Sequence, residues 1–516
     1  TRHEQSAAHM ADGFGRVSRK PGVCFATSGP GATNILTGLA TAQADSAPMI
    51  AVTGQVPVAM IGRDAFQESD IIGMANPVVK YAFQPRLPEE VPEAVKKGFY
   101  IAQTGRPGPV LLDIPKDVQQ NEAPMDFPDE FKIQGYHPWN DPDIASVEKA
   151  IDMLLNSEKP IILAGGGTII SSAFAELQSI AETLMLPVVT TFKGKGAFPE
   201  NHPLSLGPIG MHGHAEANKM MTEADCVLAI GTRFSDRSVG TFEAFEKRLK
   251  IIHMDVDPAE IGKNQTTSVA VVGDVRASLR IMVKLLLQRS VKKTEDSVWI
   301  KHVRETKDYW KENLKLHPGE MGAAKILRKL RELLPKESVV TTEVGQHQMW
   351  ASLFYDVIQP GTFFSSTGLG TMGWGFPASI GAKVARPDVP VVDIAGDGSF
   401  SMTENSLATA VLEDIPVIVF ILNNSTLGMV AQWQRTFYDR RMIGVDQGGC
   451  PDYVKLAESY GAQGIRAQSM DELDKAIKSA LSSDVATVID IPIDPEEDVL
   501  PFVAPGTSLS DMILPS

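Results

Sequence analysis

The sequence predicts an α/β protein built from three doubly wound parallel-sheet domains. Short runs of Val, Ile, Leu and Ala recur along the chain and alternate with Gly and Pro turns and helix-like segments, as expected of βαβ units. A chain of 516 residues is too long for one hydrophobic core. Two polar or charged stretches, 119–143 and 289–320, divide the apolar runs into three blocks and are predicted to be linkers.

The domain boundaries follow from these linkers. We expect domains over residues 1–118, 144–288 and 321–495, followed by a C-terminal tail over 496–516. The strands that we predict lie at 23–27, 49–53, 110–114, 160–164, 226–230, 251–255, 391–395 and 415–422.

Composition excludes some classes of function. A net charge of −15 argues against a nucleic-acid partner, and 43% hydrophobic with 22% charged residues is ordinary for a soluble globular protein. No run of about 18 apolar residues exists to span a membrane, and no signal peptide is visible. Cys24, Cys226 and Cys450 stand too far apart for a zinc or disulfide pattern. We therefore expect a cytoplasmic protein. Because the chain opens at Thr1 without a Met, we also expect that its natural N-terminus is missing.

Two predicted strands each end in an oxygen ligand. The strand at 391–395 runs into Gly396-Asp397-Gly398, a helix is predicted over 402–413, and the strand at 415–422 runs into Asn423-Asn424. Parallel strands open at the same edge of a sheet, so Asp397 and Asn424 should lie side by side. Such oxygens suit Mg²⁺, which usually keeps a phosphate in its shell, and glycines let the backbone approach that phosphate. The Gly-Asp-Gly sequence alone also fits a plain turn.

Further motifs carry a resemblance to a known family. They are Thr1–Gln5, Ser28–Asn34, Gly54–Pro57, Asp64–Glu68, Gly105–Pro109, Gly210–Gly213, Arg233–Arg237, Gly345–Trp350, Gly368–Gly373 and Leu427–Trp433. With them the chain resembles the catalytic subunit of acetohydroxyacid synthase (the biosynthetic acetolactate synthase), a family of thiamine-diphosphate (ThDP) enzymes. The resemblance covers essentially the whole chain and lacks only the family's opening strand and helix.

The resemblance implies a fold, a reaction and partners. The three domains would bind the ThDP pyrimidine, FAD and the ThDP diphosphate with Mg²⁺, and the flavin would have no net redox role. The enzyme would decarboxylate pyruvate on ThDP and transfer the hydroxyethyl group to pyruvate or 2-oxobutyrate. The products, 2-acetolactate and 2-aceto-2-hydroxybutyrate, begin branched-chain amino acid biosynthesis. A homodimer or homotetramer with shared active sites and a small regulatory subunit are also implied.

The resemblance also carries over site residues for ThDP and the metal. Glu4 would be catalytic, as the carboxyl group hydrogen-bonded to the pyrimidine ring. Mg²⁺ would be held by Asp397, Asn424 and the backbone carbonyl of Thr426. Besides Glu4, Asp397 and Asn424, the ThDP contacts would be Gln67, Gln346, His347, Gly370, Met372, Gly398, Ser399, Gly428 and Met429.

For the flavin and the substrates, the family implies two further sets. The FAD contacts would be Ser46, Arg106, Gly167, Thr191, Phe192, Met211, His212, Gly231, Arg233, Asp255, Asp274 and Val275. Arg237 would bind the substrate carboxylate, with Lys116 at the same entrance, and Trp433 would form an aromatic wall that favours 2-oxobutyrate over pyruvate as acceptor.

The residues also admit other interpretations. Without the family, Glu4 fits a solvated first-turn residue, Met372 a core residue, and Arg237 a surface ion pair with Asp236. Gly368–Gly373 formally matches the dinucleotide pattern G-x-G-x-x-G, although we interpret it as a loop beside the cofactor rings. At the level of function, one alternative is an FAD-using oxidoreductase such as a pyruvate oxidase. Another is a truncated chain that binds flavin without turnover, since a lost first strand would expose a sheet edge.

Overall fold

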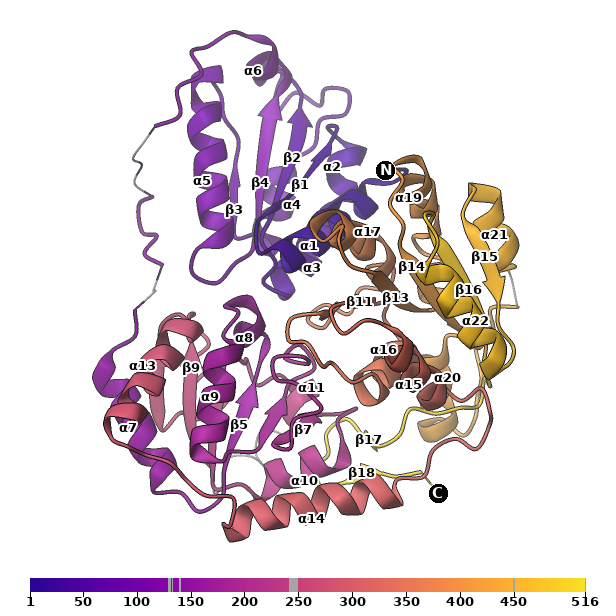
Figure 1. Cartoon of the computed structure of the whole chain (residues 1–516). Helices are drawn as coiled ribbons and strands as arrows, with labels where there is room; N and C mark the ends of the chain where they lie inside the picture. The colour runs from indigo at the N-terminus through magenta and orange to yellow at the C-terminus, as the bar shows by residue number, and fades with distance from the viewer. Residues whose placement is uncertain (129–130, 132, 139–140, 241–248, 449–450, 516) are drawn as a thin grey trace. The chain divides into compact units, whose positions relative to one another are not determined.

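A computed structural model describes residues 1–128, 131, 133–138, 141–240, 249–448 and 451–515 (Figure 1). Cys450 and part of the predicted 119–143 linker lie outside these residues. The chain forms two compact units. Unit 1 comprises residues 1–138, 338–348 and 364–495, and unit 2 comprises residues 139–337, 349–363 and 496–516.

The first sheet lies in unit 1 and has the strand order β1-β2-β4-β3, all parallel. Its strands are β1 (Gly22–Ala26), β2 (Met49–Gln55), β3 (Tyr81–Phe83) and β4 (Pro109–Pro115). Its helices are α1 (Glu4–Ser18), α2 (Pro30–Asn34), α3 (Leu36–Ala44), α4 (Ile71–Ala75), α5 (Val91–Gln103) and α6 (Lys116–Gln120). The three strands predicted here are confirmed with small shifts at their ends. The three-residue β3 was not predicted.

The third sheet in chain order has six strands, in the order β12-β11-β13-β14-β16-β15. They are β11 (Val339–Thr342), β12 (Phe363–Ser365), β13 (Val391–Gly396), β14 (Ile418–Asn423), β15 (Gln463–Arg466) and β16 (Thr487–Pro492). The pairs β11–β13, β13–β14, β14–β16 and β16–β15 are parallel. The parallel pairing of β13 and β14, which precede the two predicted metal ligands, was predicted. Its helices are α16 (Gln346–Phe354), α17 (Gly375–Ala385), α18 (Asp397–Phe400), α19 (Leu407–Leu412), α20 (Gly428–Phe437), α21 (Tyr453–Tyr460) and α22 (Met470–Leu481).

Two predicted elements of this sheet are shorter than expected. The strand predicted from Ile415 begins at Ile418, because Pro416 cannot donate a ladder hydrogen bond and the Ile415 N–H instead bonds to the Ala410 carbonyl. The helix predicted over 402–413 is the short α19, preceded by the 3₁₀ turn η4 (Glu404–Ser406). The residues before η4 turn back onto α18, where the Met402 N–H bonds to the Ser399 carbonyl.

The second sheet lies in unit 2 and has the order β10-β9-β8-β5-β6-β7, all parallel. Its strands are β5 (Pro160–Ala164), β6 (Val188–Thr190), β7 (Ser205–Pro208), β8 (Cys226–Ile230), β9 (Lys250–Asp255) and β10 (Val269–Val272). The helices of unit 2 include α7 (Ile144–Leu155), α8 (Gly166–Ile170), α9 (Phe174–Leu184), α10 (Ala215–Glu223), α11 (Asp236–Val239), α13 (Val275–Gln288), α14 (Val298–Asn313) and α15 (Ala323–Leu333).

The C-terminal tail packs within unit 2. Its two short strands, β17 (Phe502–Val503) and β18 (Met512–Ile513), pair antiparallel. Leu509 is buried in the same apolar cluster as strand residues of the second sheet, and the Val503 N–H bonds to the Met211 carbonyl at 2.8 Å. The tail is thereby tied to the loop that follows β7.

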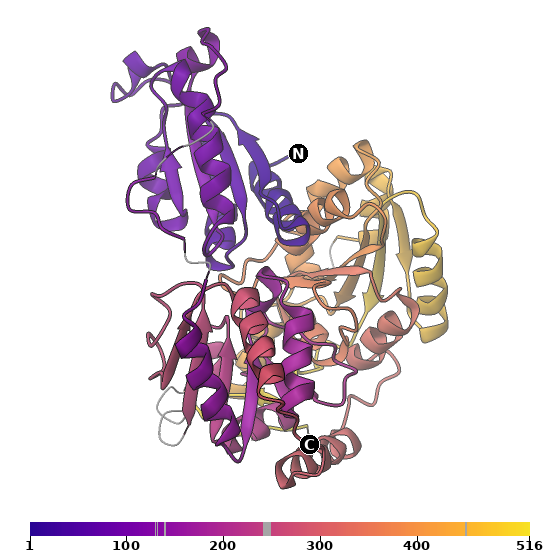
Figure 2. The ribbon, with the colours of Figure 1, turned by 60° about the vertical axis from the view of Figure 1, so that its left-hand side comes forward.

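Two helices of unit 1 touch backbone to backbone. Helices α1 and α17 lie side by side in both ribbon views (Figures 1 and 2). A Cβ atom added to Gly13 would meet the Ala378 carbonyl oxygen at 2.2 Å, and one added to Gly381 would meet the Met10 carbonyl oxygen at 1.9 Å. Since real Cβ contacts are never this short, glycine is required at both positions for this packing.

No helix in the described ranges has both the length and the apolar character needed to cross a bilayer.

Candidate functional site

The two predicted metal residues lie at one edge of the third sheet. Strand β13 ends at Gly396, which pairs with Leu422 of β14, so the two strands end nearly level. Asp397 and Asn424 follow these ends and are both buried. Burial raises the pKa of Asp397 to about 6, although hydrogen bonds from backbone N–H groups, including that of Asn424, act in the opposite direction. A carboxylate desolvated in this way would gain from a bound cation.

The donors at this edge fit a magnesium ion that also binds phosphate. Among the described residues, no three His, Cys, Asp or Glu side chains cluster as a metal site. One carboxylate with amide or carbonyl oxygens is what Mg²⁺ uses when phosphates complete its shell. The Asn424 amide is oriented, since Oδ1 accepts from the Thr426 N–H at 3.2 Å and Nδ2 donates to Gln346 Oε1 at 3.1 Å.

A cluster of amides adjoins this edge at the start of α20. A Cβ atom at Gly428 would lie 2.0 Å from Gln346 Oε1 and 2.6 Å from Asn424 Nδ2, so a side chain there would displace these two amides. Gln346 also donates from Nε2 to Gln432 Oε1 at 3.0 Å. Met429 follows Gly428 on α20 and is partly exposed. Gln432 was not singled out from the sequence, although it belongs to the quoted Leu427–Trp433 motif.

His347 lies buried between two glycines. Cβ atoms at Gly345 and Gly396 would come within 3.0 Å of its ring. Burial lowers the pKa of His347 to about 3, so the ring is neutral at physiological pH. Its buried Nε2 has no hydrogen-bond partner among the described residues. A buried polar atom without a partner is what a site has when its bound group is absent.

Ser399 is held by a buried carboxyl group that sequence reasoning missed. Its hydroxyl donates to Glu343 Oε2 at 2.6 Å and accepts from the Gly373 N–H at 3.2 Å. Burial raises the pKa of Glu343 to about 6. Burial and the neighbouring Glu343 raise the pKa of Asp393 well above its usual range. Next to Ser399, a Cβ atom on Gly398 would contact Leu427 Cδ2 at 2.8 Å.

Glu4 begins α1 and contacts the glycine turn of the first sheet. Asn34 donates to its Oε2 at 3.1 Å, and this hydrogen bond lowers the pKa of Glu4. A Cβ atom at Gly31 would lie 3.3 Å from the other oxygen, Oε1. The predicted ThDP residue Gln67 is exposed and has a positive φ of 60°. Asn34 was not predicted as a partner of Glu4, because only the folded turn brings it there.

Gly370 and Met372 lie on the loop between β12 and α17. Gly370 is exposed with a φ of 69°, and Met372 is partly exposed. The sequence 368–373 therefore forms a loop before a helix, as our interpretation required, and the strand before it, β12, is only three residues long.

Most of the predicted flavin residues lie after strands of the second sheet. The backbones of Gly167 and Gly231 are so close that a Cβ atom on either would come within 2.6 Å of the other Cα. Asp255 ends β9, and Asp274 caps α13 by accepting from the Ala277 N–H at 2.9 Å. Thr191, Phe192, Met211, His212, Arg233 and Val275 also belong to unit 2.

These residues fit a flavin nucleotide. Glycines at strand ends let a phosphate-bearing ligand approach the backbone closely, and an acidic residue at a strand end suits a ribose. The buried Nε2 of His212 has no hydrogen-bond partner among the described residues, and burial lowers the pKa of this ring to about 3. The other two predicted flavin residues lie in unit 1, where Arg106 Nε donates to Ser46 Oγ at 2.9 Å.

The three predicted substrate residues occupy different elements. Arg237, on α11, has a side chain 59% exposed, contacts Met211 Sδ at 2.9 Å through Nη1 and faces Asp236 at 3.7 Å. Its guanidinium is therefore accessible to an anion. Lys116 begins α6 and is exposed. Trp433, on α20, packs edge to face with Phe437 at 5.8 Å.

Comparison with known proteins places the chain in a family. Three models of the thiamine pyrophosphate enzyme match it: the N-terminal TPP binding domain over residues 1–74, the central domain over 147–282 and the C-terminal TPP binding domain over 343–491. The probable acetolactate synthase large subunit of Methanocaldococcus jannaschii is 47% identical over 524 residues, covering 100% of this chain and 88% of the relative. The probable acetolactate synthase large subunit of Methanococcus aeolicus is 46% identical and covers 99% of this chain and 88% of the relative. The acetolactate synthase large subunit of Parasynechococcus marenigrum is 45% identical, covering 100% and 84%. The chain thus belongs to the acetolactate synthase large-subunit family of thiamine pyrophosphate enzymes.

Proposed function

We propose that this chain is the catalytic polypeptide of an acetolactate synthase, which decarboxylates pyruvate and joins the remaining two-carbon unit to a second 2-oxo acid. The observation that carries the proposal is the match along the whole chain to relatives of that name. The oxygen donors at the edge of the third sheet support it, since they suit a magnesium ion with a diphosphate.

The chain's own residues would bind and orient the cofactor. Thiamine diphosphate, when bound, would supply a nucleophilic carbon and a cationic ring that takes up the electrons released as CO₂ leaves. Asp397, Asn424 and the Thr426 carbonyl hold the magnesium ion, and Gly398 leaves room for the phosphates. Gly428 has no side chain that would displace Gln346 and Asn424, which hydrogen-bond to each other at the same edge.

Glu4 is the proton-handling residue of the proposal. Asn34 occupies one of its oxygens, which leaves Oε1 as an acceptor toward the pyrimidine ring. Gly31 keeps that side open, since a Cβ atom there would lie 3.3 Å from Oε1. A carboxyl group in this position exchanges a proton with the cofactor ring, and such proton transfer contributes typically about 10²–10⁴-fold to rate.

Other residues would bind the carboxylate of the 2-oxo acid substrate and form the pocket for the acceptor. Arg237 presents an exposed fork of donors that suits a 2-oxo acid carboxylate, and Lys116 is a second basic residue proposed for the substrate. Trp433 forms the wall that favours the ethyl group of 2-oxobutyrate, and one methylene in such a pocket is worth about 1–3 kcal/mol.

We extend the proposal to partners and cofactors that the family implies. FAD binds at the glycine-rich edge of the second sheet as a structural group. The active enzyme is at least a homodimer whose sites draw on two chains, and a small regulatory subunit joins it, as the term large subunit in the relatives' names suggests. The cytoplasmic location expected from the sequence stays a prediction.

The test is acetohydroxy acid formation from pyruvate and 2-oxobutyrate with ThDP and Mg²⁺, with and without FAD. Both products, a bias toward 2-oxobutyrate and dependence on FAD are the expected result. Acetolactate alone without any need for FAD would contradict the flavin assignment. Reduction of FAD by pyruvate without carboligation would favour the oxidase interpretation.

Two variants sharpen this test. Glu4→Gln should lower kcat by about 10²-fold or more, because proton exchange with the cofactor is lost. Glu93→Gln is its matched control: Glu93 also lies in the first turn of a helix, on α5, but pairs with Lys97 at the surface. Equal activity of both variants would remove Glu4 from the catalytic role.

Trp433→Leu tests the acceptor wall. It should lower the preference for 2-oxobutyrate in a mixed-substrate competition by up to about 10²-fold while acetolactate formation from pyruvate survives. An unchanged ratio of the two products would show that another side chain selects the acceptor.

A further inference from the structure

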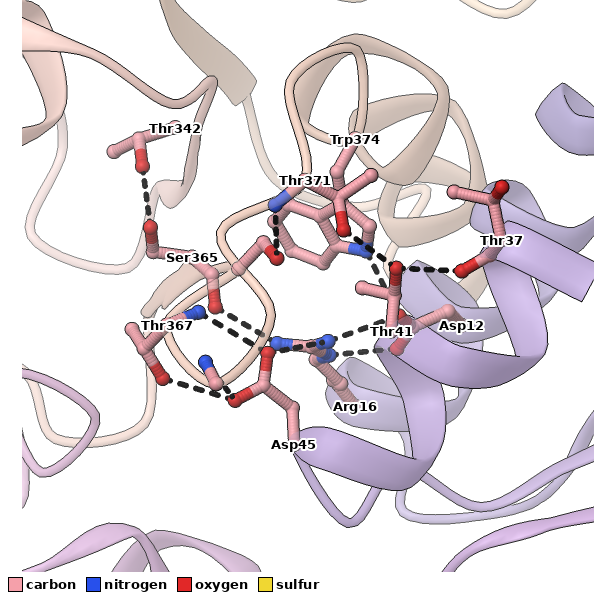
Figure 3. Close-up of polar contacts among 12 residues, drawn as sticks. Asp12, Arg16, Thr37, Thr41, Asp45, Thr342, Ser365, Thr367, Thr371 and Trp374 are labelled. Atoms are coloured by element: carbon pink, nitrogen blue, oxygen red, sulfur yellow. Dashed lines mark hydrogen bonds and ion pairs between the residues drawn. The ribbon is translucent and has the colours of Figure 1, made fainter. Parts of the chain in front are cut away.

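One loop of the third sheet is tied to the helices of the first sheet by a buried charged network (Figure 3). We call residues 366–374, between β12 and α17, the cofactor loop, because it carries the predicted ThDP residues Gly370 and Met372. The network comes from α1 and from Asp45, the C-cap residue that follows α3. All of these residues belong to unit 1.

Asp45 binds the start of the loop with both carboxylate oxygens. Its Oδ1 accepts from the Thr367 hydroxyl at 2.9 Å and from the Gly368 N–H at 3.0 Å. Its Oδ2 accepts from the Thr367 N–H at 3.1 Å. Asp45 is 2% exposed, so water does not compete for these hydrogen bonds. Three donors from two consecutive residues fix both the position and the direction of the loop backbone.

Arg16 balances the charge of Asp45. Its Nη2 contacts Asp45 Oδ2 at 3.2 Å, and its Nε and Nη2 bind the two oxygens of Asp12 at 2.6 and 2.9 Å. Its Nη1 donates to the Ser365 carbonyl, directly before the loop, at 2.8 Å. Burial alone would lower the pKa of Arg16, but Asp12 and Asp45 raise it, so the guanidinium stays charged.

Trp374 closes the network at the end of the loop. Its ring lies 4.4 Å from the Arg16 guanidinium carbon, and its Nε1 donates to Asp12 Oδ2 at 2.8 Å. Midway, the hydroxyls of Thr371 and Thr41 hydrogen-bond at 2.7 Å. The anchored residues thus flank the tip of the loop, where Leu369 and Gly370 are exposed. Figure 3 shows these contacts converging from α1 and α3 on the loop.

We propose that Asp45, ion-paired with Arg16, is a positioning residue that presets the cofactor loop for thiamine diphosphate. The inference rests on the proposed function, since Gly370 and Met372 matter only if the loop meets the cofactor rings. A loop that already holds its bound conformation spares the ligand the cost of ordering it. If the competent conformation is populated only in part, the apparent dissociation constant rises in proportion.

The main variant is Asp45→Asn, in the full chain. Asparagine keeps the shape and one acceptor oxygen, but it removes the charge opposite Arg16 and turns an NH₂ group toward a loop N–H. Amide hydrogen exchange of peptides that cover 366–374 should be about tenfold faster or more in the cofactor-free variant. The dissociation constant of ThDP, titrated with Mg²⁺, should rise by a similar factor.

The kinetic pattern separates positioning from catalysis. In Asp45→Asn, the KM for ThDP should rise while kcat at saturating ThDP stays within about threefold of wild type, because bound cofactor restores the loop. Saturating ThDP should also restore slow exchange in the loop peptides.

Asp113→Asn is the matched control. Asp113 is a fully buried carboxyl group of the same unit. It accepts hydrogen bonds from Thr53, Gln55 and Gln84, and among the described residues none of these partners belongs to the loop. Its variant should leave loop exchange and the ThDP dissociation constant at wild-type values. If Asp45→Asn does not fold, Thr367→Val removes only the hydroxyl bond to Asp45 and should show a smaller change of the same kind.

Two results would overturn the proposal. Wild-type loop exchange and ThDP affinity in both Asp45→Asn and Thr367→Val would show that the contacts do not position the loop. Equal effects in Asp113→Asn would show a general loss of stability. If the wild-type chain itself bound no ThDP, the proposed function would fail first, which is distinct from normal wild-type binding with unaffected variants.

Discussion

Two buried carboxyl groups hold the two ends of the cofactor loop, and the charged groups beside them differ. Asp45 accepts from Thr367 and Gly368 at the start of the loop and is paired with Arg16. Glu343 accepts from the Gly373 N–H at 2.7 Å at the end of the loop and from the Phe376 N–H at 2.9 Å just beyond it. Its close neighbour is another acid, Asp393.

This difference between Asp45 and Glu343 predicts which end of the loop responds to pH. An acid paired with arginine keeps its charge over the physiological range, because guanidinium does not lose its proton. Two buried acids side by side raise each other's pKa or share a proton. An ion pair therefore holds the start of the loop. Hydrogen bonds to Glu343, a carboxyl group with a raised pKa, hold its end.

The largest expected effect comes from removing the cation of the first cluster. Arg16→Leu removes the cation that Asp12 and Asp45 share, and breaking a buried pair in this way costs about 3–5 kcal/mol. The urea midpoint of unfolding, followed by tryptophan fluorescence, should fall accordingly. The double variant with Asp12→Asn should recover part of the loss; no recovery would mean that uncompensated charge is not the cause.

A medium effect is expected from the second cluster, as a change in pH dependence. The folded pKa of Glu343, about 6, exceeds its ordinary value of 4.5, so the folded chain holds a proton that the unfolded chain has released between these pH values. The free energy of unfolding should therefore fall by about 2 kcal/mol as pH rises from 4.5 through 6 on account of Glu343. Asp393, also raised, adds to this decline.

Asp393→Asn separates the two contributions. The amide resembles the neutral acid and does not titrate, so the variant should lose only the share that belongs to Glu343, while wild type loses more. Urea midpoints of both proteins between pH 4.5 and 7.5 measure the difference. Parallel profiles for wild type and variant would contradict the assignment of a raised pKa to Asp393.

The smallest effect should come from a neutral contact between the two clusters. Thr41→Val removes the buried hydroxyl that bonds to Thr371 while keeping the side-chain shape. A loss of about 1 kcal/mol is expected, with no change in pH dependence, because no charge is involved. A loss as large as that of Arg16→Leu would mean that the ion pair is not the main anchor of the loop.

The eight strands that the sequence predicted are all present, because apolar runs mark them directly, but others, including the six-residue β16, were not predicted. β5 and β8 have the predicted bounds, whereas short strands such as β3 carry too little pattern. Asp397 and Asn424 could be placed together because parallel strands fix where their carboxyl ends meet. The helix predicted over 402–413 was too long, since local propensity does not reveal a chain that turns back on itself.

The structural roles of the buried acids Asp45 and Glu343 could not be predicted, because the residues that they contact lie far away in the sequence. Asp45 stands beside the predicted flavin residue Ser46, yet its loop partners come more than 300 residues later. In the sequence, Glu343 does not lie within an apolar run and cannot be distinguished from an exposed charged residue. The roles of Glu4, Arg237 and Trp433 rest on family resemblance and stay predictions.

The contact between α1 and α17 sets a limit on how this chain can vary during evolution. Any replacement at Gly13 or Gly381 would force the two helices apart, and Arg16 and Trp374 sit on or beside those helices. In a library of all single substitutions, both glycines should be intolerant even to alanine. Exposed Leu369 at the tip of the loop should accept many residues. New specificities can therefore arise at the tip only while the helix pair beneath it stays unchanged.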